Sequence, residues 1–362
     1  MERCGTIPEA AAGLRYHGGN INGARHQFPD APQPWIDLST GINPLPYPIG
    51  AIAPGVWAKL PELSAVAALE AAARTAYGAG PSTDIVAAPG TQALIQWLPR
   101  IFPARRVGVL GFTYEEHERC WRAGGAEVTT VTALADLAAF DVGIVVNPNN
   151  PDGRTYPPES LAETAVSFAE KGGLLVVDEA FMDVLGRRNS LVPRFPEAGA
   201  LVLRSFGKIY GLAGLRLGFA AASPEVGAIL RRAIGPWAVS GLALEIGQRA
   251  LTDESWLTRA VSRLCGEANR LDGLLQAAGF EIVGGTPLFR LAQHKDAPRW
   301  FEWLAHAGIL TRPFNARPDW LRFGIPPALA DWDRLEAAIH DGCTRQATGG
   351  VEAGDEALDH AR

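Results

Sequence analysis

Short apolar runs alternate with helical stretches along residues 85–219, and this alternation limits the possible folds more than any other feature. Strands are expected at Ile85–Ala88, Val107–Leu110, Val142–Val146, Leu174–Val177 and Leu201–Leu203, and helices at Thr91–Ile101 and Pro158–Lys171. Repeated strand–helix units of this kind predict a mostly parallel sheet covered by helices on both faces. Polar residues and glycines follow the strands directly, at the edge where open α/β sheets bind ligands. We therefore expect an α/β fold whose site lies at that edge.

The composition of the chain changes along its length. We expect an N-terminal arm, a large domain, a small α+β domain and a disordered tail, with bounds 1–56, 57–237, 238–345 and 346–362. The Gly- and Pro-rich arm is expected to be ordered, because a disordered arm would seldom carry Trp35 and Ile36. An apolar stripe predicts a long amphipathic helix over about 238–275. The tail is polar and aperiodic, which is typical of a disordered terminus.

The bulk properties exclude several classes of function. The 362 residues carry a net charge of -6, with 47% hydrophobic and 20% charged residues. This balance gives no electrostatic argument for binding nucleic acid or an anionic membrane. No signal-peptide core or apolar window of about 18 residues is present, so a cytoplasmic location is expected. The four cysteines and seven histidines are scattered without a CxxC or HExxH pattern, which predicts reduced thiols and no metal site.

A lysine in a glycine-rich turn is the first candidate for chemistry. Lys208 follows the predicted strand Leu201–Leu203 in the sequence SFGKIYGLAGLRLGF, whose glycines let the backbone approach a bulky ligand closely. Ser205 and Arg216 lie on either side and suit phosphate oxygens. A lone lysine in such a loop would more often be a solvent-exposed side chain. Its interpretation therefore depends on its neighbours.

A second candidate anion site follows the first strand. Gly90, Thr91 and Gln92 open a helix, where free backbone N–H groups and the helix dipole attract an anion. Thr91 could equally be a plain N-cap. Tyr114, in GFTYEEH after the next strand, is a candidate to stack on a planar ligand, although a single tyrosine is more often a core residue.

An acid and an amide follow the next two strands. Asp178 ends an apolar strand, where its carboxylate would stay ionised beside a cationic ring. The alternatives for Asp178 are a helix cap or a metal ligand. Asn147, Asn149 and Asn150 lie in NPNNPDG, whose prolines and glycine impose an irregular loop. An amide held there can donate to a ring hydroxyl, or it can serve the turn alone.

Taken together, these residues meet the requirements of one cofactor. Pyridoxal 5′-phosphate needs a lysine for covalent attachment, an acid for the pyridine nitrogen and a donor for the ring hydroxyl. It also needs a phosphate cradle and a stacking surface. Since a candidate for each need follows a predicted strand, the sequence predicts a pyridoxal phosphate site centred on Lys208.

The same segments resemble a known family. GTQALI, TYEEH, NPNNPDG, VVDEAF and SFGKIYGLAGLRLGF are similar to motifs of the class I and II aminotransferases, which are fold-type I pyridoxal phosphate enzymes, and LRFGI at 321–325 resembles their carboxylate-binding segment. The resemblance implies that Lys208 bears the cofactor, that Asp178 pairs with its pyridine nitrogen and that Asn150 donates to its hydroxyl. Thr91, Ser205 and Arg216 would hold the phosphate, and Arg322 would bind the substrate carboxylate. A homodimer is also implied.

The sequence of the N-terminal arm resembles one particular group within this family. YHGGNINGARHQFPDAPQPWIDLSTGINPLPYP is similar to the opening of the threonine-phosphate decarboxylases of cobalamin (vitamin B12) biosynthesis. This implies a small phosphorylated amino-acid substrate, L-threonine O-3-phosphate, decarboxylated to (R)-1-amino-2-propanol O-2-phosphate. His17, Asn20 and Arg312 are then candidate contacts to the substrate phosphate. The alternative for the arm residues is that a Gly-rich arm simply packs on the domain.

Two positions depart from the aminotransferase pattern. Phe181 stands where that pattern carries a tyrosine that donates to the ring hydroxyl, which argues against plain transamination. Leu60, in Lys59-Leu60-Pro61, replaces a tyrosine that reaches the phosphate of the neighbouring subunit's cofactor. Tyr47 or Trp57 could supply that contact instead.

Three functions stay open at this point. The residues fit a threonine-phosphate decarboxylase, a histidinol-phosphate-type aminotransferase, or a non-catalytic cobalamin-pathway protein that keeps the fold. The presence of Lys208, Asp178 and Arg216 argues against the third.

Overall fold

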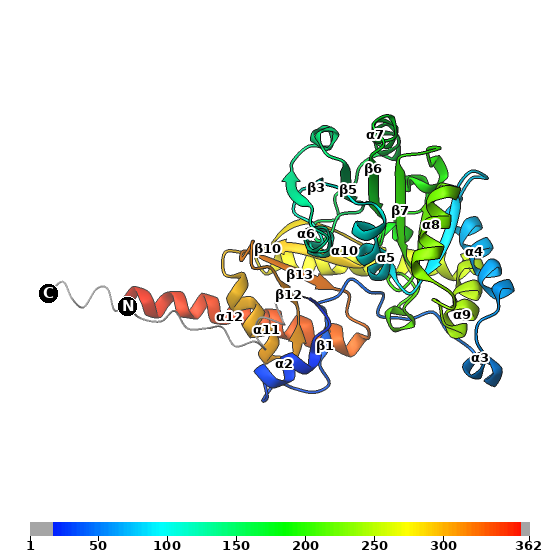
Figure 1. Ribbon diagram of the computed structural model, residues 1–362. Helices are drawn as coiled ribbons and strands as arrows, with labels where there is room; N and C mark the ends of the chain where they lie inside the picture. Colours follow the sequence, from blue (N-terminus) through cyan, green and yellow to red (C-terminus); the bar gives the residue numbers. More distant parts are fainter. Residues whose placement is uncertain (1–16, 356–362) are drawn as a thin grey trace. The chain divides into compact units, whose positions relative to one another are not determined.

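The computed structural model describes residues 17–355 of the chain, with side chains described as far as Arg345 (Figure 1). It contains two compact units, which are described separately. One unit is Leu45–Arg263, and the other combines the described residues of Met1–Pro44 and Leu264–Arg362. The unit boundaries thus differ from those expected at 56 and 237. Segments on both sides of the predicted large domain pack with it, as when Gly247 lets its helix approach Leu69 closely.

A seven-stranded sheet forms the centre of the larger unit. Its strands are β2 (Asp84–Ala88), β3 (Arg106–Leu110), β4 (Glu127–Val131), β5 (Val142–Val146), β6 (Leu174–Asp178), β7 (Ala200–Ser205) and β8 (Gly218–Ala222). The order is β2-β8-β7-β6-β5-β3-β4, and β8 runs antiparallel to both of its neighbours while the other pairs are parallel. The prediction of a mostly parallel sheet is confirmed.

Helices cover both faces of this sheet (Figure 1). The helices that lie wholly within the larger unit are α3 (Pro54–Ala58), α4 (Leu63–Tyr77), α5 (Thr91–Ile101), α6 (Glu115–Ala123), α7 (Pro158–Glu170), α8 (Pro224–Ile234) and α9 (Gly241–Thr252). On one face, Leu94 of α5 and Trp121 of α6 belong to a buried cluster with Val176 and Leu203 of the sheet. Phe168 of α7 packs closely over Gly143 in β5. Because side chains alternate between the faces of a strand, both faces of these apolar strands are buried.

Short 3₁₀ helices connect several of these elements. They are η1 (Leu134–Ala139), η2 (Met182–Val184), η3 (Arg187–Asn189), η4 (Val192–Arg194) and η5 (Ala213–Leu215). Two of them bear on the site, since η2 follows β6 and η5 lies in the segment between β7 and β8.

The single long helix expected over 238–275 is two helices. The helix α9 ends at Thr252, and α10 (Glu254–Ala277) begins after Asp253. The Asp253 carboxylate accepts hydrogen bonds from the backbone N–H of Trp256 (2.9 Å) and from the Ser255 hydroxyl (2.8 Å). An aspartate that caps the first turn in this way favours a new helix start over continuation, so the chain breaks although the apolar stripe continues.

The smaller unit is α+β, as predicted. Its elements are α2 (Ile21–Gln27), β1 (Ile36–Asp37), β9 (Glu281–Thr286), β10 (Phe289–Gln293), α11 (Ala297–His306), β11 (Ile309–Leu310), β12 (Arg312–Pro313), β13 (Trp320–Gly324) and α12 (Leu329–Asp355). An antiparallel sheet has the order β12-β13-β10-β9, and β1 pairs in parallel with β11.

The end of the chain is more helical than expected. The helix α12 continues to Asp355, so residues 346–355, expected to be disordered, are helical, and 356–362 lie outside the described residues. Extending an existing helix costs far less than starting one, which a composition argument ignores. Residues 1–16 of the predicted arm also lie outside the described range. Within 17–355, every helix is too short or too polar to cross a lipid bilayer.

Candidate active site

The predicted acid and the predicted lysine follow neighbouring strands. Asp178 is the last residue of β6 and is 3% exposed, while Ser205 is the last residue of β7. Lys208 lies three residues further on, half-buried in the turn after β7. Its Nζ lies 5.4 Å from the centroid of the Phe181 ring. Since β6 and β7 pair in parallel, their ends bring these side chains to one edge of the sheet, as the sequence predicted.

A cradle for an anion is formed at the start of α5. Gly90 precedes the helix with φ 85°, and a Cβ at Gly90 would lie 2.8 Å from Nη2 of Arg216. A Cβ at Gly218 would lie 2.6 Å from the backbone nitrogen of Thr91. These two glycines therefore let the Arg216 guanidinium and strand β8 approach the free N–H groups of the helix. A guanidinium beside a helix N-terminus is an arrangement suited to phosphate.

The backbone conformation of Arg216 and a hydrogen bond to the preceding turn fix its position. It has φ 54°, in the left-handed region that a non-glycine residue seldom adopts, and its Nη1 donates to the carbonyl oxygen of Ala213 (3.3 Å). Such a conformation costs of order 1–3 kcal/mol and is found most often at functional sites. In the same segment, Gly207 lies against the Cα of Ala213, where a Cβ would approach to 2.7 Å. The turn that carries Lys208 is thus closed tightly on itself.

One histidine that sequence reasoning missed joins the site. Nε2 of His117 lies 2.9 Å from Oδ2 of Asp178, and the His117 side chain is fully buried. A carboxylate can only accept, so Nε2 carries the proton. The residue stands in TYEEH, three positions after Tyr114. That spacing places both residues near one face at the start of α6, which was the available signal.

Tyr114 and Gln92 form a hydrogen-bonded chain with Glu116. The Tyr114 hydroxyl donates to Oε1 of Gln92 (3.2 Å), and Nε2 of Gln92 donates to Oε2 of Glu116 (2.8 Å). These hydrogen bonds connect Tyr114 and Gln92, both predicted to bind the cofactor, to the buried Glu116 of α6.

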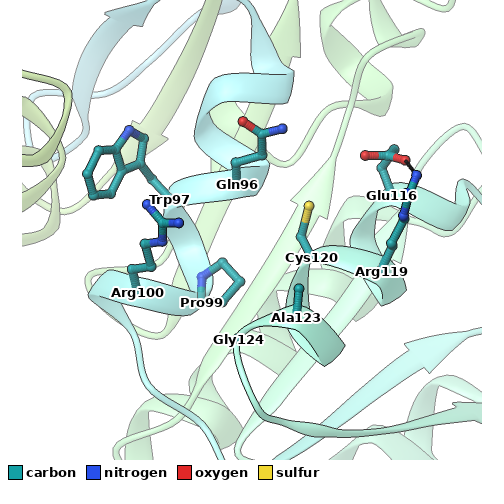
Figure 2. Close-up of a pocket in the computed structure, with 9 residues that line it drawn as sticks. All are labelled: Gln96, Trp97, Pro99, Arg100, Glu116, Arg119, Cys120, Ala123 and Gly124. Atoms are coloured by element: carbon teal, nitrogen blue, oxygen red, sulfur yellow. Dashed lines mark hydrogen bonds and ion pairs between the residues drawn. The ribbon is translucent and has the colours of Figure 1, made fainter.

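Glu116 also faces a separate pocket. This pocket has a volume of about 560 Å³ and is lined by side chains from α5 and α6. Figure 2 shows the Glu116 and Arg119 side chains directed toward each other. None of the residues predicted to bind the cofactor lines it. The pocket is therefore distinct from the site at the strand ends.

The three asparagines of NPNNPDG have different roles. Asn147 holds the loop by accepting from the N–H of Tyr156 (2.9 Å), and the amide of Asn149 donates to the carbonyl oxygen of Phe112 (3.0 Å). These two are fully buried, whereas Asn150 is half-buried. Asn150 therefore remains the candidate donor to a ligand on the basis of the family resemblance.

The two arginines predicted to bind substrate are neighbours in the smaller unit. Arg312 and Arg322 are directly paired between β12 and β13. Arg322 is 6% exposed, and its Nη2 donates to the carbonyl oxygen of Ser39 (2.9 Å). Burial, together with the positive charge of Arg312, lowers the pKa of Arg322 to about 9, while the Asp37 carboxylate acts in the opposite direction. Two adjacent positive charges with one buried form a site that favours anions.

The arm segment HGGN packs beside these arginines. A Cβ at Gly18 would lie 2.3 Å from the carbonyl oxygen of Ser39, and the N–H of Gly19 donates to the Ser39 hydroxyl (2.7 Å). His17 is exposed. The side-chain oxygen of Asn20 caps α2 by accepting from the N–H of Gly23 (2.9 Å). This gives Asn20 a structural task, and its substrate contact remains a prediction.

The donor set fits pyridoxal phosphate. A buried carboxylate with a histidine partner, a lysine, a half-buried amide and a glycine-lined cradle with an arginine all belong to the larger unit. Among the residues that the structure describes, no three His, Cys, Asp or Glu side chains gather as a metal site would require.

Known proteins resemble most of the chain. The model of the family described as aminotransferase class I and II matches residues 35–339. A threonine-phosphate decarboxylase of Pseudomonas aeruginosa is 40% identical over 326 residues, covering 89% of this chain and 96% of the relative. A second one, from Sinorhizobium sp, is 41% identical and covers 89% of this chain and 97% of the relative.

Histidinol-phosphate aminotransferases are more distant. The enzyme of Streptomyces avermitilis is 31% identical over 66% of this chain and 69% of its own length. The structure of the Sinorhizobium meliloti enzyme in complex with pyridoxal-5′-phosphate has a TM-score of 0.76 at 18% identity, and the match covers 96% of this chain and 99% of that one. At this identity the likeness shows a shared fold.

We expect His117→Phe to weaken binding of pyridoxal phosphate by roughly 5- to 100-fold, because losing a hydrogen bond to a buried charged group costs about 1–3 kcal/mol. Titration of cofactor-free protein with pyridoxal phosphate, followed by absorbance, measures the affinity. Trp121→Phe, at a buried position on the same helix, is the matched control and should bind as the unchanged protein does. Equal affinities for both variants would show that His117 does not support Asp178.

Proposed function

Because the chain belongs to the class I and II aminotransferase family, we propose that it uses pyridoxal 5′-phosphate to decarboxylate L-threonine O-3-phosphate to (R)-1-amino-2-propanol O-2-phosphate in cobalamin biosynthesis. Two decarboxylases about 40% identical along nearly their whole lengths support this assignment. The structural observation that carries it is the paired Arg312 and Arg322, since a substrate with a carboxylate and a phosphate needs two cationic partners.

The residues at the strand ends have separate tasks in this proposal. When bound, the cofactor supplies an electron sink for the bond that breaks at Cα. Lys208 holds it covalently, and Asp178, oriented by His117, keeps a proton on its ring nitrogen. Asn150 donates to the ring hydroxyl. The phosphate group is held by Thr91, Ser205 and Arg216, and Tyr114 stacks on the ring.

The two arginines of the smaller unit have a separate proposed task, which is to bind the two ends of the substrate. The orientation in which the protein holds the substrate would decide which bond at Cα is broken. We propose that Arg322 binds the substrate carboxylate, that Arg312 binds its phosphate, and that His17 assists. Two fixed ends restrict rotation of the substrate about its Cα–N bond. Loss of CO₂, rather than of the Cα proton, then follows from how the substrate is held.

A histidinol-phosphate-type aminotransferase is the second candidate. It would use the same lysine, acid and phosphate cradle, and it would depend on an oxo acid such as 2-oxoglutarate. The shorter and weaker match to such enzymes, together with Phe181 at the tyrosine position, favours the decarboxylase.

Purified holoenzyme should release CO₂ from O-phospho-L-threonine without any oxo acid, and Lys208→Ala should abolish the release. The expected product is the phosphorylated amino alcohol, identified by mass spectrometry. Absence of CO₂ together with 2-oxoglutarate-dependent conversion of histidinol phosphate would assign the chain to the aminotransferases instead. A purified protein that takes up no cofactor would support the non-catalytic alternative.

Replacing Arg312 or Arg322 in turn should show which group of the substrate each arginine binds. We expect Arg312→Met to raise KM for O-phospho-L-threonine by roughly 10- to 100-fold, since a hydrogen bond to a charged group contributes about 1.5–3 kcal/mol, and to leave the reaction of unphosphorylated L-threonine unchanged. Arg322→Met should weaken the reaction of both substrates, because both carry the carboxylate. Steady-state kinetics with the two substrates test this. An equal effect of Arg312→Met on both would remove Arg312 from the phosphate site.

We also propose a homodimer. Large apolar side chains are exposed at Trp57 (68%), Leu63 (87%) and Trp237 (59%). Leu63 and Trp237 line one cleft of about 390 Å³, and Gly241 lies against Val56 of α3. Trp237 is held outward at φ 55°, an uncommon conformation for a tryptophan. Large apolar side chains exposed to this extent are typical of an interface. The hydroxyl of Tyr47 lies 3.5 Å from Asp253, which leaves Trp57 as the better candidate to replace the missing tyrosine.

Trp237→Glu should convert the dimer to a monomer, because burying a carboxylate in an interface costs free energy that burying an indole ring does not. Light scattering coupled to size-exclusion chromatography measures the mass. Leu329→Glu, at another exposed apolar position, is the control and should leave the mass unchanged. A monomeric unchanged protein would contradict the proposal outright.

A further inference from the structure

The ammonium group of Lys208 faces an aromatic ring. Its Nζ lies 5.4 Å from the centroid of Phe181, which is 4% exposed and follows β6 three residues after Asp178. A phenyl ring offers no donor or acceptor, only the negative face of its π system. Within about 6 Å that face attracts a cation and does not attract a neutral amine. The contact therefore discriminates between the two protonation states of Lys208.

We propose that Phe181 is a positioning residue that keeps Lys208 protonated once the substrate amine has released it, so that Lys208 donates a proton to Cα instead of removing one. The inference rests on the proposed decarboxylase function. It adds a residue that decides which of two opposite proton transfers Lys208 carries out.

The two transfers differ in where one proton goes. In decarboxylation the bond between Cα and the carboxylate breaks, CO₂ leaves, and the electron pair stays at Cα. Lys208 gives one proton to Cα and becomes a neutral amine, and the overall reaction consumes one proton from solvent. Transamination would begin with the reverse event, in which a neutral Lys208 takes the Cα proton. An environment that favours the ammonium form promotes the first reaction and suppresses the second.

Other charged or titratable groups belong to the elements that end at the same edge of the sheet. The charged or titratable side chains at this edge are Asp178 on β6, His117 on α6, Tyr114 before α6, Tyr210 in the same turn and Arg216 after η5. A nearby carboxylate favours an ammonium ion, and a nearby guanidinium opposes it. These groups stay constant if only the electron density of the Phe181 ring is changed. The test therefore alters the ring and nothing else.

Fluorinated phenylalanines placed at position 181 provide a graded test. Each added fluorine withdraws electrons from the ring face with little change in shape. In cofactor-free protein, the pH dependence of Lys208 acetylation, measured by isotope-paired labelling and mass spectrometry, reports its protonated fraction. We expect the midpoint to fall stepwise along the series, by roughly half a pH unit in total, as a cation–π contact of about 0.5–1 kcal/mol implies. An unchanged midpoint would overturn the proposal.

Controls are present within the same molecule. The chain has four lysines, and Lys171, held by the carbonyl oxygens of Ala138 (2.6 Å) and Phe140 (2.9 Å), serves as the internal standard. The same fluorinated residues at Phe219, a fully buried position in β8, control for disturbance of the core. In the Phe219 variants, the acetylation midpoints of both Lys208 and Lys171 should stay unchanged.

A second readout uses the holoenzyme in D₂O. The ratio of Cα-proton exchange in O-phospho-L-threonine, followed by NMR, to CO₂ release should rise along the fluorine series and rise further in Phe181→Leu. A constant ratio would refute the role of Phe181 even if the labelling midpoint moves. If the unchanged enzyme releases no CO₂, the proposed function fails, whereas the labelling result still decides whether Phe181 controls the lysine.

Discussion

A buried arginine between two carboxylates fixes the geometry on which the site depends. Arg204 in β7 is 2% exposed, and its Nη1 lies 2.9 Å from Oε2 of Glu179, while Nη2 donates to Asp183. Ser190 and the N–H of Leu191 complete the bonds to Glu179 (2.5 and 2.7 Å). Arg204 precedes Ser205, and Glu179 follows Asp178. Because alternate residues of a strand face opposite sides, the charged cluster lies behind the site and joins its two central strands.

The cluster matters for position more than for net stability. A buried ion pair gains little over apolar residues of equal volume, but removing one partner costs about 3–5 kcal/mol because a charge stays buried alone. Burial raises the pKa of Glu179, and Arg204, Ser190 and Leu191 act in the opposite direction. Such a cluster tolerates few alternative arrangements. It therefore holds Asp178 and the Lys208 turn in register, as a cofactor with fixed ring dimensions requires.

The sequence predicted the parts of the site that follow from local chemistry. Every expected strand of the large sheet is present, and Asp178, Ser205 and Lys208 meet at its edge because parallel strands end there. What could not be predicted depends on contacts distant in sequence or on a single capping residue. His117 becomes a partner of Asp178 only when α6 packs against β6, 61 residues away along the chain. Asp253 ends a helix whose apolar stripe runs on unbroken. The unit boundaries depend on packing that composition does not encode.

The residues proposed to hold the cofactor would not by themselves determine which reaction takes place. An acid, a lysine and a phosphate cradle would serve decarboxylation and transamination equally, since both need the same electron sink. To favour decarboxylation over transamination, the protein must hold the substrate in one orientation and keep Lys208 in one protonation state. In the proposed function Arg312 and Arg322 bear on the first requirement, because a buried arginine beside a second positive charge favours an anion. Phe181 bears on the second, because a ring without a hydroxyl can stabilise an ammonium ion but cannot hold a neutral amine by a hydrogen bond. In the proposed function, the choice of reaction therefore depends on side chains that need not touch the cofactor ring.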